Sequence, residues 1–294
     1  MSSCNGNCSS CGSDCADRKQ ESLLAQLNPK STVKKVIAVV SGKGGVGKST
    51  AAGNIAAGLA FGGRRVLLVD MDIGLRSLDL MLGAENDVVY DLVDVVQGVC
   101  PLEQALYRDR RRENLFLLPA SQQTGSSAVT PEDMRALARK FKGSFDYVIF
   151  DCPAGVGRGF RNACAAADSA ILVITPDPVC VRDAERVREL LKADGITDMQ
   201  LLINRVARRN PLSTDECIHL LDLPVLGFIP EDPAVGFAAA AGSQVLDRET
   251  SAGDAFERVT RRLLGETIRY RIPHDRLTHR LRTGFGKEAS CKKG

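Results

Sequence analysis

The stretch Ser41-Gly-Lys-Gly-Gly-Val-Gly-Lys-Ser-Thr50 decides the fold, because its residues Gly42–Ser49 fit the pattern G-x-x-x-x-G-K-[ST]. The apolar run Val36–Val40 precedes it, and a helical stretch over Ser49–Ala60 follows it. A strand before and a helix after are the context that this motif requires. Glycines let backbone N–H groups turn inward around phosphate oxygens, and the helix N-terminus adds its positive dipole. The sequence therefore predicts a phosphate-binding loop.

Two side chains at the end of this loop suit a nucleoside triphosphate. Lys48 is expected to contact the β- and γ-phosphates, and the Ser49 hydroxyl is expected to ligate Mg²⁺. The remaining residues of the predicted cradle are Gly42, Gly44, Gly45, Val46, Gly47 and Thr50.

Short apolar runs alternate with helical patterns along the rest of the chain. The runs are Val66–Val69, Leu115–Leu118, Tyr147–Phe150, Ala170–Ile174, Leu201–Ile203 and Val225–Phe228. Helical stretches between them include Pro131–Phe141, Asp183–Lys192 and Gly253–Leu264. This alternation is typical of parallel βαβ units with helices on both faces. The predicted fold class is therefore α/β, with a doubly wound, mostly parallel sheet.

The chain divides into three predicted segments: a flexible Cys-rich leader (1–33), one P-loop domain (34–268) and a basic tail (269–294). A hydrophobic content of 44% is normal for a chain with a sizeable core. The formal net charge is +3, yet residues 265–294 alone hold eight Lys or Arg against three Asp or Glu. The basic character therefore lies in the tail, and the body is slightly acidic.

No membrane-spanning or secretory segment is expected. The chain has no window of 18 apolar residues, and Met1–Gln20 lacks the apolar core of a signal peptide. We therefore expect a cytoplasmic protein whose ten cysteines stay reduced. Five scattered cysteines are expected to be small core residues: Cys100, Cys152, Cys164, Cys180 and Cys217.

Aspartates follow two of the predicted strands. Asp70 and Asp72 come at the end of Val66–Val69, and Asp151 ends Tyr147–Phe150 in the Walker B arrangement. At the carboxyl end of a strand beside a phosphate loop, an Asp can hold Mg²⁺ or orient an attacking water. Such residues are often simple turn formers, but two such strands beside one phosphate loop favour the catalytic interpretation.

Lys43 is an extra lysine inside the loop. The form K-G-G-x-G-K-[ST] resembles the deviant Walker A family of P-loop ATPases, which includes the MinD, ParA, Mrp and nitrogenase iron proteins. In that family the first lysine crosses a dimer interface to the partner's phosphates. The resemblance therefore implies Mg²⁺-dependent ATP hydrolysis, an ATP-dependent homodimer, and catalytic roles for Lys43, Lys48, Asp72 and Asp151, with Asp72 orienting water.

Further segments resemble the MinD family of bacterial division-site ATPases over roughly residues 34–265. They are 70–80 (DMDIGLRSLDL), 88–95 (VVYDLVDV), 113–121 (ENLFLLPAS), 151–155 (DCPAG) and 181–186 (VRDAER). Two positions depart from the family pattern: Ser77 replaces an Asn, and Cys152 replaces a Ser. Neither change removes a group needed for Mg²⁺ or phosphate.

This resemblance implies a switch that places the division site. MinD-type proteins bind membrane as ATP dimers, recruit the division inhibitor MinC, and are released by MinE or positioned by another factor. The resemblance also implies adenine contacts from Asn204, Pro230, Glu231 and Asp232. The expected location is the cytoplasm and, peripherally, the inner face of the cell membrane. A MinD-like regulator of flagellar number shares the same features and stays open as an alternative.

The tail suits an anionic membrane surface. Leu277, Leu281 and Phe285 are spaced four apart and share one face if the tail is helical, and Lys and Arg flank them. A basic amphipathic helix can lie among lipid headgroups. The apolar face is short, so two tails in a dimer would bind far better than one. The alternative is a solvated basic tail.

Four cysteines cluster in the leader: Cys4, Cys8, Cys11 and Cys15. Four close thiolates can hold Zn²⁺ or an iron–sulfur cluster. The leader resembles that of some Mrp-type iron–sulfur carrier ATPases, which supplies a rival function. Those carriers also use a later C-x-x-C pair, and this chain has none after Cys15.

A ParA-like segregation ATPase is a further rival. It would bind DNA non-specifically through a basic body surface. Because the body is slightly acidic, no specific nucleic-acid partner is expected.

Overall fold

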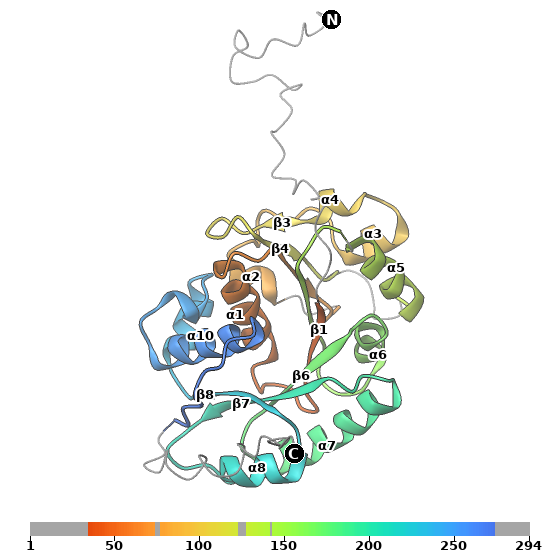
Figure 1. Ribbon diagram of the computed structural model, residues 1–294. Helices are drawn as coiled ribbons and strands as arrows, with labels where there is room; N and C mark the ends of the chain where they lie inside the picture. The colour runs from red at the N-terminus through yellow and green to blue at the C-terminus, as the bar shows by residue number, and fades with distance from the viewer. Residues whose placement is uncertain (1–34, 74–76, 123–127, 142, 274–294) are drawn as a thin grey trace, which may run out of the picture.

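The computed structural model describes residues 35–73, 77–122, 128–141 and 143–273 (Figure 1). The leader, most of the tail, and the predictions that fall on them lie outside these residues. Within them, one eight-stranded sheet has the order β3-β4-β2-β5-β1-β6-β7-β8. The strands are β1 (Lys35–Val40), β2 (Val66–Asp70), β3 (Tyr107–Arg108), β4 (Leu115–Leu118), β5 (Tyr147–Asp151), β6 (Ser169–Ile174), β7 (Met199–Val206) and β8 (Val225–Pro230).

Every neighbouring pair of strands is parallel except β3 and β4. Strand β1 lies between β5 and β6, with Val39 opposite Asp151 and Ile171. Strands β2, β4, β5 and β6 are buried along their whole length. Continuous apolar runs of this kind form strands because helices exclude water from both faces of a parallel sheet.

Helices cover the sheet on both sides (Figure 1). On one face, α1 packs against α10 and α2, and α2 packs against α9; on the other, α5 packs against α6, and α7 against α8. Their bounds are α1 (Lys48–Phe61), α2 (Leu78–Leu82), α5 (Pro131–Phe141), α6 (Arg158–Cys164), α7 (Pro178–Ala193), α8 (Thr214–Leu221), α9 (Ala234–Ala240) and α10 (Ser251–Leu263). Two short helices, α3 (Leu92–Gln97) and α4 (Leu102–Ala105), and the 3₁₀ turn η3 (Val245–Asp247) complete the fold.

The predicted α/β class and mostly parallel sheet are confirmed. All seven predicted strands form, and the five scattered cysteines are buried thiols. The antiparallel edge strand β3 was not predicted, because two residues carry no periodic signal. Among the described residues, no helix is both long and apolar enough to cross a membrane.

Candidate nucleotide-binding site

The phosphate loop joins β1 to α1 and depends on three glycines. Gly45 and Gly47 have φ angles of 76° and 93°, a left-handed conformation that side chains rarely adopt. A Cβ atom on Gly47 would also collide with the Asn204 amide, and one on Gly42 would lie 2.5 Å from Asp183. The loop therefore fits between β7 and α7 only with glycine at these positions.

Neighbouring strands fix the shape of the loop. Ser41 Oγ donates to Lys43 O at 2.7 Å, and the Gly155 N–H donates to Ser41 O at 3.1 Å. Asn204 Nδ2 donates to Val46 O at 2.7 Å from the end of β7. The backbone of the cradle is thus fixed by the polypeptide before any nucleotide binds, which lowers the ordering cost of binding.

Asp151 is the most unusual carboxylate of the site. It ends β5, directly opposite Asp70 on β2, and is 1% exposed. No hydrogen bond of ordinary geometry reaches either carboxylate oxygen within the described chain, although the Ser49 hydroxyl is close enough to act on the carboxylate. Burial and the charge of Asp70 raise its pKa to about 8, although Ser49 and Lys48 act in the opposite direction. A buried carboxylate beside a second carboxylate suits a site for a cation.

Asp70 has a different task. Burial raises its pKa to about 6, but three backbone N–H groups oppose the rise. They belong to Asp72, Ser77 and Leu78, at 3.0, 3.2 and 3.4 Å from the carboxylate oxygens. Asp70 therefore organises the chain after β2. Ser77 takes part through its backbone N–H, so the replacement of Asn at this position leaves the contact intact.

Asp72 stands at the mouth of the site. Burial raises its pKa, and the positive charge of Lys48 lowers it. Lys48 itself is 8% exposed, at the start of α1. Asp72 and Asp151 both interact electrostatically with this lysine, so the three groups converge on one place at the carboxyl edge of the sheet.

A cavity of about 330 Å³ opens beside Gly47 and Thr50. The residues expected at the adenine all contribute to its lining: Asn204, Pro230, Glu231 and Asp232. Burial acts to raise the pKa of Asp232. Hydrogen bonds from the Ala234 and Ala252 N–H groups nevertheless hold that pKa below its ordinary value. Asp232 therefore joins β8 to the starts of α9 and α10 as well as lining the cavity.

Lys43 lies apart from the other loop lysine. Its Nζ is 3.8 Å from Asp177, the N-cap residue of α7, and its side chain is 48% exposed. An exposed pair of this kind contributes about 1 kcal/mol at most, so it does not fix the lysine in place.

Sequence reasoning missed the groups that support the loop. Gly155 and Asp183 lie against it from distant segments that only the folded chain brings together, whereas Ser41 directly precedes the loop in sequence. Among the described residues, no group of three or more His, Cys, Asp or Glu side chains could hold a metal ion. The four leader cysteines lie outside those residues.

Comparisons with known proteins agree with this geometry. A family model described as an AAA domain matches residues 34–193. The septum site-determining protein MinD of Synechocystis sp. is 41% identical over 84% of this chain and 97% of its own length.

Two solved structures extend the comparison. The MinC:MinD complex of Aquifex aeolicus gives a TM-score of 0.74 at 38% identity, covering 80% of this chain and 97% of that chain. MinD of Pyrococcus horikoshii, solved with Mg-ADP, gives 0.72 at 31% identity, covering 78% and 95%. The fold, the phosphate loop and these similarities together place the chain in the MinD family of septum site-determining ATPases.

Proposed function

We propose that this chain hydrolyses Mg·ATP and uses the bound nucleotide to control its own dimerisation and its attachment to the membrane. The observation that carries the hydrolytic part is Asp151, a buried carboxylate at the end of β5 on which Ser49 and Lys48 act from the start of α1. The relative from P. horikoshii was solved with Mg-ADP, which supports the same cofactor here.

The donor set fits Mg²⁺. This cation prefers oxygen ligands and keeps several waters, so one hydroxyl and one or two carboxylates suffice. Ser49 and Asp151 would hold it, and the raised pKa of Asp151 would fall as the proton gives way to the cation. The bound cation would neutralise charge on the β- and γ-phosphate oxygens.

The chain's own groups then perform the remaining tasks. Lys48 and the N–H groups of 42–47 stabilise charge on the phosphates, as the helix N-terminus favours anions. Asp72 is half-buried near Lys48, where a carboxylate can orient a water for attack on the γ-phosphate. Asn204 and the segment Pro230–Asp232 would enclose the base.

Lys43 supplies the link to assembly. Its exposed amine makes only a weak contact with Asp177, so it can reach the phosphates of a second subunit. ATP would thereby hold two copies together. Two basic tails on one dimer would then bind an anionic membrane more tightly than one tail. The A. aeolicus relative was solved with MinC, which supports a MinC-like partner for this chain.

The direct test of hydrolysis is a Mg²⁺ titration of ATPase activity. Asp151→Asn keeps the size of the side chain but removes its charge, and we expect activity to fall on the order of a hundredfold. Asp215→Asn, on the exposed surface of α8, is the matched control. Equal activity in Asp151→Asn and the parent would remove Asp151 from the mechanism.

A further inference from the structure

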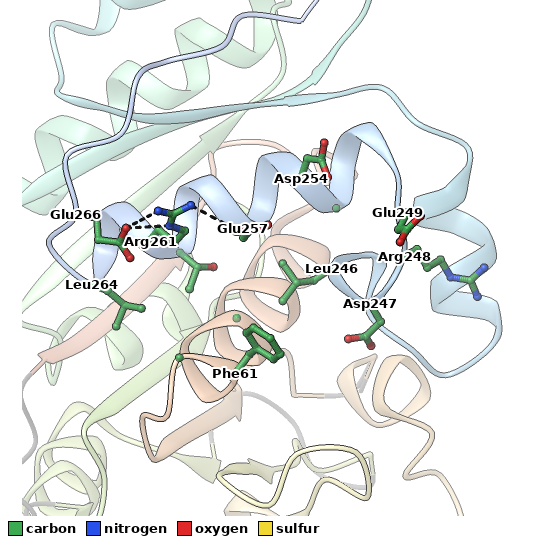
Figure 2. Close-up of a pocket in the computed structure, with 14 residues that line it drawn as sticks. Phe61, Leu246, Asp247, Arg248, Glu249, Asp254, Glu257, Arg261, Leu264 and Glu266 are labelled. Atoms are coloured by element: carbon green, nitrogen blue, oxygen red, sulfur yellow. Dashed lines mark hydrogen bonds and ion pairs between the residues drawn. The ribbon is translucent and has the colours of Figure 1, made fainter.

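A groove of about 620 Å³ lies at the other end of α1 from the phosphate loop (Figure 2). Helix α1 begins at Lys48 and ends at Phe61, so about 20 Å of helix separates the groove from the nucleotide site. The outer side of α10 and the turn around Asp247–Glu249 form its other walls.

The floor of the groove is apolar. Phe61 is 85% exposed, the highest value among the large hydrophobic residues of the described chain. Leu246 and Leu264, both partly buried, lie on either side of it (Figure 2). Helices α1 and α10 touch where Gly58 meets Thr260, and the groove opens beyond that contact. An exposed aromatic ring between two leucines is a typical anchor point for an apolar side chain.

The walls of the groove are acidic. Five carboxylates but only two arginines line it, namely Asp247, Glu249, Asp254, Glu257 and Glu266 against Arg248 and Arg261. Arg261 is already ion-paired with Glu257 at 3.5 Å and with Glu266 at 2.7 Å, and Asp247 forms an ion pair with Arg112 from outside the groove. Glu249 and Asp254 are exposed on the wall beside Leu246 (Figure 2). The groove therefore suits an occupant that is both apolar and positively charged.

The described chain ends on a different side of α10 from the groove, beside Arg258 and Arg262. After α10 it returns alongside the helix, since the Arg262 guanidinium donates to Ile268 O and Arg269 O at 3.3 and 2.8 Å. Ile272 is buried, and Arg271 lies close enough to Arg258 to help burial lower the pKa of that guanidinium. Pro273 thus lies on the Arg258 side of α10, one helix width (about 10 Å) from the groove.

We propose that residues 274–294 of the same chain occupy the groove between α1 and α10. This segment carries six Lys or Arg against two Asp or Glu, opposite in sign to the groove. Leu277, Leu281 and Phe285 supply apolar side chains for the floor around Phe61. The 21 residues would span about 30 Å even as a helix, enough to cross α10 and run along its 13 residues.

If the tail also binds membrane, as the proposed function holds, the groove and the membrane need the same side chains. The apolar side chains that would contact Phe61 are the ones that would enter a membrane, so one tail cannot do both. The groove would then compete with lipid for the tail, and only a dimer with two tails would overcome that competition readily. Binding of the tail in the groove depends only on the contacts between the two and does not require the membrane role.

The test is limited trypsin digestion of the full chain with ADP, followed by mass spectrometry of the fragments cut at Arg276, Arg280 and Arg282. Phe61→Ser removes the floor, and the double variant Glu249→Gln/Asp254→Asn removes charge from the wall. Either change should speed cleavage of the tail about tenfold, because cleavage follows the population of the open form. Leu220→Ser is the control, since Leu220 is 46% exposed on α8, on the opposite face of the sheet.

Tail cleavage that is equally fast in the parent and in both groove variants would overturn the proposal. If Phe61→Ser does not fold, the comparison between the parent and Glu249→Gln/Asp254→Asn still decides the question. Protection that weakens on dilution would mean that a second copy fills the groove, which also overturns seating within one chain. ATP-dependent sedimentation with anionic vesicles is measured separately: a protected tail without vesicle binding would leave the seating intact and refute the membrane role.

Discussion

The two ends of helix α1 carry different kinds of surface. At Lys48 the helix begins in a loop whose positive φ angles require glycine, beside buried charges where Asp70 and Asp151 have raised pKa values. At Phe61 it ends in an open groove with an apolar floor and exposed carboxylates. A site for small-molecule chemistry is built from charges held out of water, whereas a docking surface keeps its charges solvated. Substitutions should therefore have large effects at the first end and small effects at the second.

The largest effect is expected at Lys48. Lys48→Ala removes the charge that we propose acts on the phosphates, so kcat should fall on the order of 10²- to 10³-fold. Steady-state phosphate release measures it, with Lys192→Ala on α7 as a control because Lys192 forms only an exposed ion pair with Glu189. An unimpaired kcat in Lys48→Ala would contradict the assignment of the loop.

Lys43 should separate binding from assembly. Lys43→Ala removes only a weak contact with Asp177, so nucleotide binding should change by less than about 1 kcal/mol. Dimerisation with ATP should be lost, because the variant lacks the lysine that we propose reaches the partner's phosphates. Light scattering with a slowly hydrolysed ATP analogue gives the mass of the complex. A variant that still dimerises would exclude the cross-interface role.

Gly47 tests the strain at this end of the helix. Gly47→Ala must place a Cβ at a φ of 93° and against the Asn204 amide, so the free energy of unfolding should fall by about 1–3 kcal/mol. Denaturant unfolding measures the loss. Gly63→Ala is a matched control, since Gly63 has a φ of 76° but nothing within 4 Å of its Cβ position. Equal losses would show that the contact with Asn204 adds nothing.

The buried carboxylates predict how stability depends on pH. The pKa of Asp151 is raised to about 8 and that of Asp70 to about 6, so the folded protein binds protons that the unfolded chain releases. Without nucleotide, stability should therefore fall as pH rises from about 4, the ordinary carboxyl pKa, to about 8. Thermal melting over this pH range measures the effect. The melting temperature should change less with pH in Asp151→Asn, and in the parent with Mg·ADP, than in the parent without nucleotide. The same pH dependence of the melting temperature in all three cases would show that Asp151 is not the group that holds the proton.

The groove end should tolerate change. Phe61→Ser alters a side chain that is 85% exposed on the described body, so the free energy of unfolding should fall by no more than about 1.4 kcal/mol, the equivalent of tenfold weaker seating of the tail. ATPase activity without membrane should not change, and a lower activity would show that the two ends are not independent.

Sequence reasoning was accurate where the chemistry is local. The glycines and lysines of 42–48 are consecutive, and Asp151 directly follows an apolar run, so short patterns predict both. The order of the strands in space, the hydrogen bond from the Gly155 N–H to Ser41 O and the close approach of Asp183 to Gly42 depend on contacts between distant segments. No spacing in one sequence encodes them.

The groove between α1 and α10 could not be predicted from the sequence either. Phe61, Asp247 and Glu266 are far apart in the chain and belong to no motif. Their proximity follows from the packing of α1 against α10 around Gly58 and Thr260. The basic tail was recognisable from composition, but an acidic counterpart on the body could be found only in the folded chain.

The central claim is that the nucleotide at one end of α1 controls attachment of the whole protein. Sedimentation of the full chain with anionic or neutral vesicles, in ATP or in ADP, tests it most directly. The account predicts that ATP drives the protein onto anionic vesicles, that ADP releases it, and that Lys43→Ala stays in the supernatant. A protein that remains unbound in both nucleotides, or binds equally in both, would contradict it.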